Sequence, residues 1–266
     1  MNIPSPHVIP DRRMRRAGVL LGFAMGGFFD GILLHQILQW HHLLSAVHTG
    51  ALADLRFQVT VDGWFHALMY ALAAAGLWTL YRLRSAPGAS LRLIAPPFWM
   101  GFGGWHILDA VFSHWITGIH RIRMNSDIPL FWDVAWLAVF GLIPFFLGWS
   151  RRSTGGEPPT QRGPVSLALL AAALVAAGAA NIFPLRGDND TTVVTMRPDA
   201  SAAGLLKALD GTDARIVWTD RAGGVWVVQG LSLPAGLALY RSGALYVSGT
   251  ASPAGCAAWL RPAGGA

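Results

Sequence analysis

Five apolar segments, each long enough to cross a membrane as a helix, constrain the fold of this chain more than any other feature. The hydrocarbon core of a bilayer is about 30 Å thick and requires roughly 20 apolar residues in a helix. Only 13% of the 266 residues are charged, against about a quarter in soluble domains, so the sequence predicts an integral membrane protein. The segments lie at about residues 17–42, 61–81, 93–119, 129–150 and 164–185.

The arginines lie mainly between the apolar segments and indicate the orientation. Arginine-rich stretches at 12–16, 82–92 and 151–162 flank the segments on one side, and the opposite loops hold fewer arginines. Cytoplasmic loops carry the excess of Lys and Arg, so we expect a bacterial inner-membrane protein with a cytoplasmic N-terminus and a periplasmic C-terminal domain. The same distribution argues against nucleic-acid binding despite the net charge of +6.

A linker rich in glycine and proline separates the first four segments from the fifth. The fifth segment is rich in alanine and has no ionisable side chain, which is typical of a membrane anchor. The predicted boundaries are 1–16 for the cytoplasmic N-terminus, 17–150 for a four-span bundle, 151–163 for the linker, 164–185 for the fifth helix and 186–266 for an outer domain.

The outer domain has the pattern of a small α+β fold. TTVVTM and RIVWTD predict strands, ASAAGLLKALDG predicts a short helix, and AGG at 222–224 and RSG at 241–243 predict hairpin turns, which favours a βαββ-type domain. The predicted fold class is therefore an all-α integral membrane four-helix bundle, built as a duplicated two-helix hairpin, with a fifth transmembrane helix and a small extracytoplasmic α+β domain.

An internal repeat contains most of the histidines, eight of which lie between residues 35 and 120. The first segment contains GFAMGGFFDGILLHQILQWHH and the third contains GFGGWHILDAVFSHWITGIHR, which share the pattern G-F-x6-D-x4-H-x5-H. An offset of 79 aligns Asp30 with Asp109, His35 with His114 and His41 with His120. An offset of 71 aligns Asp62 with Asp133 in the segments that follow.

Ionisable side chains inside a bilayer cost roughly a few kcal/mol each, so a functional role is the first interpretation of the repeat. The alternative is an interhelical Asp–His network that fixes packing. Four-helix bundles bind metals through side chains that converge from facing helices. Counting inward from the outer ends of the segments places four direct metal ligands in one layer: His35, His66, His114 and Asp133.

The remaining polar residues of the bundle are predicted to support this layer. A second metal site, or a relay at the entrance, is predicted from His41, His42, Asp62 and His120. A deeper proton relay is predicted from Asp30, His106 and Asp109. Hydrogen bonds to the ligands, or packing, are predicted for Gln36 and Gln39. Arg121 is expected to neutralise an aspartate at the outer rim or to bind an anionic headgroup.

Imidazole and carboxylate ligands suit iron, copper(II), zinc or manganese. The single cysteine, Cys256, excludes Cys-type zinc sites and Cys-ligated iron–sulfur clusters, and the ferritin-like E-x-x-H signature is absent because the only glutamate, Glu157, lies in the linker. Copper or non-haem iron is the expected cofactor, and zinc is an alternative. Haem b would use one or two histidines and leave the aspartates unexplained.

The run FDGILLHQILQWHH and the following DGWFH resemble a bacterial membrane-protein family catalogued as domain of unknown function 2243, over about residues 17–150. The resemblance implies a four-span fold and little defined chemistry. Members often accompany respiratory oxidases and copper-handling proteins, which favours a copper-linked role. The chain departs from the family at His120-Arg121, where a His pair is usual, and at His106 and Asp109, where Asn and Glu are usual, so its site is expected to be asymmetric.

These observations predict a membrane metalloprotein whose site opens to the extracytoplasmic side and performs redox or oxygen chemistry on a lipid-soluble substrate such as a quinol or hydrocarbon. A copper or metal carrier, or an accessory subunit for a respiratory oxidase, is the main alternative. A proton or cation pathway is the third, although the inner halves of the segments are almost wholly apolar. The expected partners are the bilayer and, through the C-terminal domain, a respiratory oxidase or another membrane complex.

Overall fold

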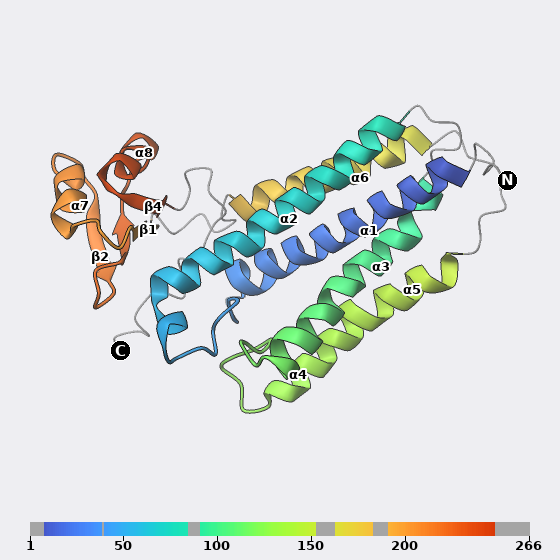
Figure 1. The fold of residues 1–266 in the computed structure, drawn as a ribbon, viewed down its shortest axis with the longest axis horizontal. Coiled ribbons are helices and arrows are strands. Elements are labelled where there is room, and N and C mark those ends of the chain that lie inside the picture. Colours follow the sequence, from blue (N-terminus) through green and yellow to red (C-terminus); the bar gives the residue numbers. More distant parts are fainter. Residues whose placement is uncertain (1–7, 39, 85–90, 153–162, 183–190, 248–266) are drawn as a thin grey trace, which may run out of the picture. The chain divides into compact units, whose positions relative to one another are not determined.

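The computed structural model describes residues 8–38, 40–84, 91–152, 163–182 and 191–247, and it is mostly helical (Figure 1). The chain divides into two compact units, a helical one and a mixed one. The helical unit comprises residues 1–31 and 66–179, and the mixed unit comprises residues 32–65 and 180–266.

A helix or an unbroken run of helices covers most of each predicted membrane segment, but residues 40–42 and 117–119 lie outside helices, and residues 183–185 lie outside the described part of the chain. The helical runs are α1 (Val8–Asp30) with the π-helix η1 (Gly31–Ile37), α2 (Leu55–Leu83), α3 (Leu91–Asp109) with the π-helix η3 (Ala110–Ile116), α4 (Pro129–Trp136) with the π-helix η4 (Leu137–Leu142) and α5 (Ile143–Arg151), and α6 (Gly163–Ile182).

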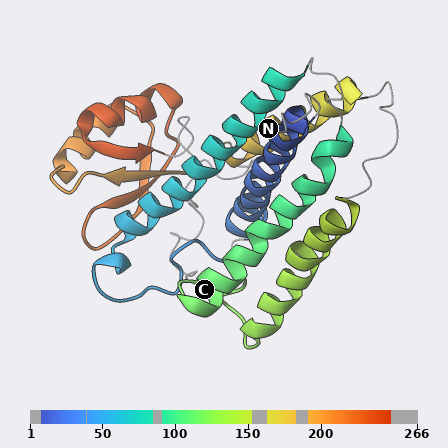
Figure 2. The ribbon, with the colours of Figure 1, turned by 45° about the vertical axis from the view of Figure 1, so that its right-hand side comes forward.

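Within the helical unit, α1 and α3 lie side by side because glycines allow their backbones to approach closely (Figures 1 and 2). A Cβ atom on Gly22 would overlap the carbonyl oxygen of Phe98, and one on Gly101 would overlap that of Val19. Gly101 and Phe98 are the repeat equivalents of Gly22 and Val19, so the two contacts are reciprocal. The repeat therefore packs its first helices against each other with approximate twofold symmetry.

An apolar core joins four helices of this unit. Leu21 of α1 packs in a cluster with Leu80 of α2, Ile94 of α3 and Leu174 of α6. Tyr70 also donates a hydrogen bond of 2.7 Å from its hydroxyl to the Gly178 carbonyl, which ties α2 to α6.

Two of the described helical runs are long and apolar enough to cross a membrane, Arg12–His35 and Pro129–Arg151, and α6 has a shorter apolar stretch at Leu167–Ala180. The five predicted spans are thus supported in part by this criterion. The polar residues of the repeat in α2, and the proline, tryptophan and histidine residues of α3, lower the mean hydropathy of those helices. The four-span bundle itself remains a prediction.

In the mixed unit, a 3₁₀ turn η2 (Ala51–Ala53) precedes α2, and the C-terminal part forms a four-stranded antiparallel sheet of order β2-β3-β1-β4. Its elements are β1 (Thr191–Met196), α7 (Ala202–Leu209), β2 (Arg215–Thr219), β3 (Val225–Gln229), α8 (Leu233–Leu239), the 3₁₀ turn η5 (Tyr240–Ser242) and β4 (Ala244–Val247). This βαββαβ order is the split βαβ arrangement of ferredoxin-like folds.

The predicted strands, short helix and first hairpin are present, but the second hairpin is wrong. Residues 241–243 connect α8 to β4, and Gly243 ends the 3₁₀ turn with φ +98°. Helix α8 begins at Leu233 because Ser232 caps it by accepting a hydrogen bond from the Ala235 amide. One face of the sheet buries Val194 and Val228 against Leu205 of α7 and Leu239 of α8.

Candidate metal centre

A π-helical segment places the central residues of the second repeat. Helix η3 follows Asp109 directly, and its wide turn is marked by the Thr117 amide, which donates to the Phe112 carbonyl at 2.9 Å. Residues five apart in an α-helix are about 140° apart around the axis. The i→i+5 bonds of a π-helix bring such residues close to one face, so Asp109 and His114 meet although the depth count assigns them to different layers.

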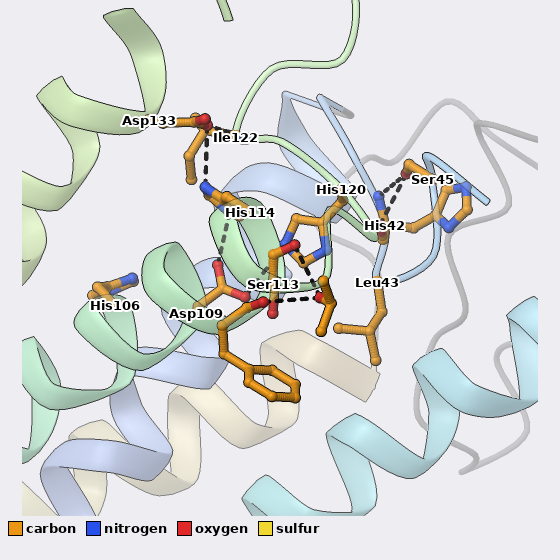
Figure 3. A network of polar contacts seen from close by, with 12 residues as sticks. His42, Leu43, Ser45, His106, Asp109, Ser113, His114, His120, Ile122 and Asp133 are labelled. Atoms are coloured by element: carbon orange, nitrogen blue, oxygen red, sulfur yellow. Dashed lines mark hydrogen bonds and ion pairs between the residues drawn. The ribbon is translucent and has the colours of Figure 1, made fainter. Parts of the chain in front are cut away.

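Three side chains of the helical unit converge on one point (Figure 3). The Asp109 carboxylate lies 3.1 Å from His114 Nε2 through Oδ2 and 3.3 Å from His120 Nε2 through Oδ1. His120 lies after the end of η3, beyond a turn at Gly118 with φ +63°. Each of the three side chains is at most 4% exposed, and together they form a group that could hold a metal ion.

Asp133 of α4 lies on the other side of His114. Its Oδ1 is 3.1 Å from His114 Nδ1 and accepts a 3.0 Å hydrogen bond from the Ile122 amide. Its Oδ2 accepts a 2.8 Å hydrogen bond from Arg121 Nη1. Figure 3 shows His114 between the two carboxylates, with its Nδ1 toward Asp133 and its Nε2 toward Asp109. The expectation that Arg121 neutralises an aspartate is confirmed.

The first repeat has the same local geometry within the mixed unit. His35 Nδ1 lies 3.3 Å from Asp62 Oδ1, which also accepts a 3.3 Å hydrogen bond from the Leu43 amide. The ring centroids of His35 and His41 are 4.9 Å apart, and the two ring planes form an angle of 74°. The rings of their equivalents in the second repeat are 4.9 Å apart at 70°, and η1 aligns residue for residue with η3. The duplication seen in the sequence is therefore also a duplication of side-chain geometry.

His42 occupies the position in the first repeat that Arg121 occupies in the second. The His42 amide donates to Ser45 Oγ at 2.6 Å, and the Ser45 hydroxyl donates to the His42 carbonyl at 2.9 Å (Figure 3). The His42 side chain is buried. The two repeats therefore differ here in charge.

His106 lies apart from these contacts, in an aromatic environment. Trp136 Nε1 donates a 3.2 Å hydrogen bond to His106 Nδ1, and the rings of Phe29, Phe102 and Phe140 lie within 6.1 Å of the imidazole. Among the described residues, His106 Nε2 has no hydrogen-bond partner. Since Nδ1 accepts a hydrogen bond, the proton of this imidazole belongs on Nε2.

The other predicted site residues are placed as follows. Asp30 is the buried last residue of α1, and His66 is buried on α2, one helical turn after Asp62. Gln36 lies in η1, but its side chain and residue Gln39 lie outside the described part of the chain. The π-helices were not anticipated, and nothing in the hydropathy pattern distinguishes them from α-helix.

The donor set limits the chemistry of the second repeat. Two imidazole nitrogens and one carboxylate are the ligands of the facial triad that binds non-haem iron, and they also suit copper or zinc. A metal-bound histidine usually donates its other ring N–H to a carboxylate, which fixes the ring, and Asp133 stands in that position on His114.

Residues 17–154 of the 266, just over half of the chain, match the family DUF2243, described as predicted membrane proteins. No curated protein and no solved structure matches the chain. The chain therefore belongs to the DUF2243 family of predicted membrane proteins.

Proposed function

We propose that this protein is an integral membrane metalloprotein that binds non-haem iron or copper through Asp109, His114 and His120. The observation that carries the proposal is the Asp109 carboxylate, whose two oxygens lie 3.1 and 3.3 Å from the Nε2 atoms of two buried histidines. Asp133 supports it, because a carboxylate on His114 Nδ1 keeps Nε2 directed at the ion.

The ligand set favours a single ion over haem. Both imidazoles face the same carboxylate, whereas an axial haem ligand directs its nitrogen at the iron of a large planar group. A non-haem ion with two histidines and one carboxylate keeps coordination positions open for oxygen and substrate. The protein would supply the fixed ligands and exclude water from a site whose ligands are almost fully buried.

Redox or oxygen chemistry on a lipid-soluble substrate, such as a quinol, is the activity that we assign to this centre. The distribution of arginines supports a site open to the extracytoplasmic side of the bacterial inner membrane, with the C-terminal domain in the periplasm. That domain is the proposed contact for a respiratory oxidase or another membrane complex. Because the three ligands are buried, the bound metal should exchange slowly with solution. Slow exchange favours an enzyme over a metal carrier.

Elemental analysis and an optical spectrum of the full-length protein in detergent test the proposal. We expect bound iron or copper without a Soret band. His114→Ala and His120→Ala should each lose the ion of the second repeat. His48→Ala removes an exposed histidine from a loop and is the matched control, which should keep the full metal content.

Retention of all metal by a folded His114→Ala variant would overturn the site. A Soret band would replace the ion with a b-type haem. If the bound metal passes quickly to a soluble chelator and the protein turns over neither quinol nor oxygen, the carrier function would be the correct one.

A further inference from the structure

The second repeat carries one permanent positive charge that the first repeat does not have at the equivalent position. Arg121 pairs with Asp133 at 2.8 Å, while the first repeat has His42 there. The Arg121 side chain is 39% exposed and the Asp133 side chain is fully buried. The guanidinium therefore lies behind Asp133, on the opposite side of the His114 ring from Asp109, with one nitrogen on the buried carboxylate and part of its surface exposed.

The charges of the second repeat do not balance a divalent ion. Asp109 and Asp133 supply two negative charges, Arg121 supplies one positive charge, and histidines that bind metal are neutral. The protein groups therefore sum to −1, and a divalent ion raises the sum to +1. Arg121 is partly exposed, so solvent screens part of its charge, but the net positive charge near the ion still favours the binding of one more negative group.

We propose that the centre binds its divalent metal together with one small monoanion, and that the positive charge of Arg121 favours this anion. The inference rests on the proposed metal site and adds the class of its co-ligand. The monoanion completes the coordination of the ion and neutralises the charge that Arg121 introduces. Arg121 acts on the anion through its charge and not through a hydrogen bond, because its Nη1 contacts Asp133 and Asp133 lies between Arg121 and His114.

The first repeat provides the test substitution. Arg121→His installs the residue that occupies this position in the first repeat, and Arg121→Lys keeps the positive charge. The full-length protein in detergent is loaded with Co²⁺ and titrated with azide, followed by the visible absorption of the cobalt. Circular dichroism checks that both variants are folded.

We expect azide to perturb the cobalt spectrum of the original protein and to bind about tenfold more weakly to Arg121→His, because the Coulomb attraction between Arg121 and the anion is lost. Arg121→Lys should remain within about threefold of the original protein. Without added anion, Arg121→His should bind Co²⁺ more tightly than the original protein, since the repulsion is gone. A merely structural role of Arg121 would weaken both affinities together.

Three results would overturn the inference. Unchanged azide affinity in Co²⁺-loaded Arg121→His would remove Arg121 from anion binding. A Co²⁺-loaded original protein whose spectrum ignores azide would remove the monoanion and leave the metal site in place. Failure of the original protein to bind any Co²⁺, iron or copper would remove the metal site and the inference together.

Discussion

His114 contacts both aspartates of the second repeat and is the central residue of its site. Its two ring nitrogens face two different carboxylates at 3.1 Å each, and its side chain is fully buried. A metal ligand needs one nitrogen for the ion and one for the group that orients the ring. The two aspartates therefore have different roles, with Asp109 beside the ion and Asp133 behind the histidine.

Asp133→Asn tests this division of roles. An amide can still hold the ring through a hydrogen bond but loses the charge that strengthens His114 as a ligand, so metal affinity should fall about 10- to 100-fold. Competition with a chelator measures the change. Asp127→Asn, in an exposed loop, should have no effect. Complete loss of the ion would make Asp133 a direct ligand, as the sequence predicts, and unchanged affinity would remove it from the site.

His106→Leu tests whether the buried His106 serves the stability of the fold or the metal site. The substitution leaves the Trp136 indole N–H without its acceptor, which should lower the free energy of unfolding by about 1–3 kcal/mol. Denaturant unfolding in detergent measures this loss, and elemental analysis should find the metal content unchanged. Loss of metal from the folded variant would show instead that His106 belongs to the centre.

At the scale of elements, the site depends on helices that depart from α-geometry. Each repeat has a seven-residue π-helix directly after its first aspartate, η1 after Asp30 and η3 after Asp109. π-Helical turns are uncommon and often occur at functional sites, because they re-aim side chains without breaking the helix. Here the wide turn of η3 directs His114 back toward Asp109.

Gly101→Ala tests the close contact between α1 and α3. The added Cβ would overlap the Val19 carbonyl, a backbone atom that cannot move away cheaply, so the free energy of unfolding should fall by about 1–3 kcal/mol. Thermal unfolding in detergent measures this. Gly104→Ala, on the same helix, is the matched control, because a Cβ there has no described neighbour within 4 Å. Equal stability of the two variants would argue against the close contact between α1 and α3.

At the scale of the whole molecule, the chain combines a helical unit with a mixed unit that has its own sheet and core. The family match covers the repeat and ends at residue 154, before the fifth helix and the sheet. The part that matches the family and the C-terminal part are therefore distinct in sequence. This division is consistent with a membrane part that holds the chemistry and an added domain that serves another purpose.

The single cysteine allows the predicted orientation to be measured directly. Cys256, which lies outside the described residues, should react with a membrane-impermeant maleimide in intact cells if the C-terminal domain is periplasmic. Ser153→Cys in a Cys256→Ser background places the thiol in the linker, where labelling should require permeabilised cells. The reverse pattern would invert the topology.

The sequence alone determined the approximate positions of the five long helical runs, the duplication and the histidines and aspartates that lie within it. Those properties follow from hydropathy and residue spacing, which are local and read directly along the chain. Only the tertiary structure decided which atoms meet. Asp109 reaches His114 because η3 is a π-helix, and His120 reaches the same carboxylate from beyond the turn at Gly118. Arg121 was expected at an aspartate, but its partner, Asp133, comes from a separate helix. A change of a fraction of a helical turn moves a side chain from one partner to another, and the hydropathy pattern of the sequence is the same for the two arrangements.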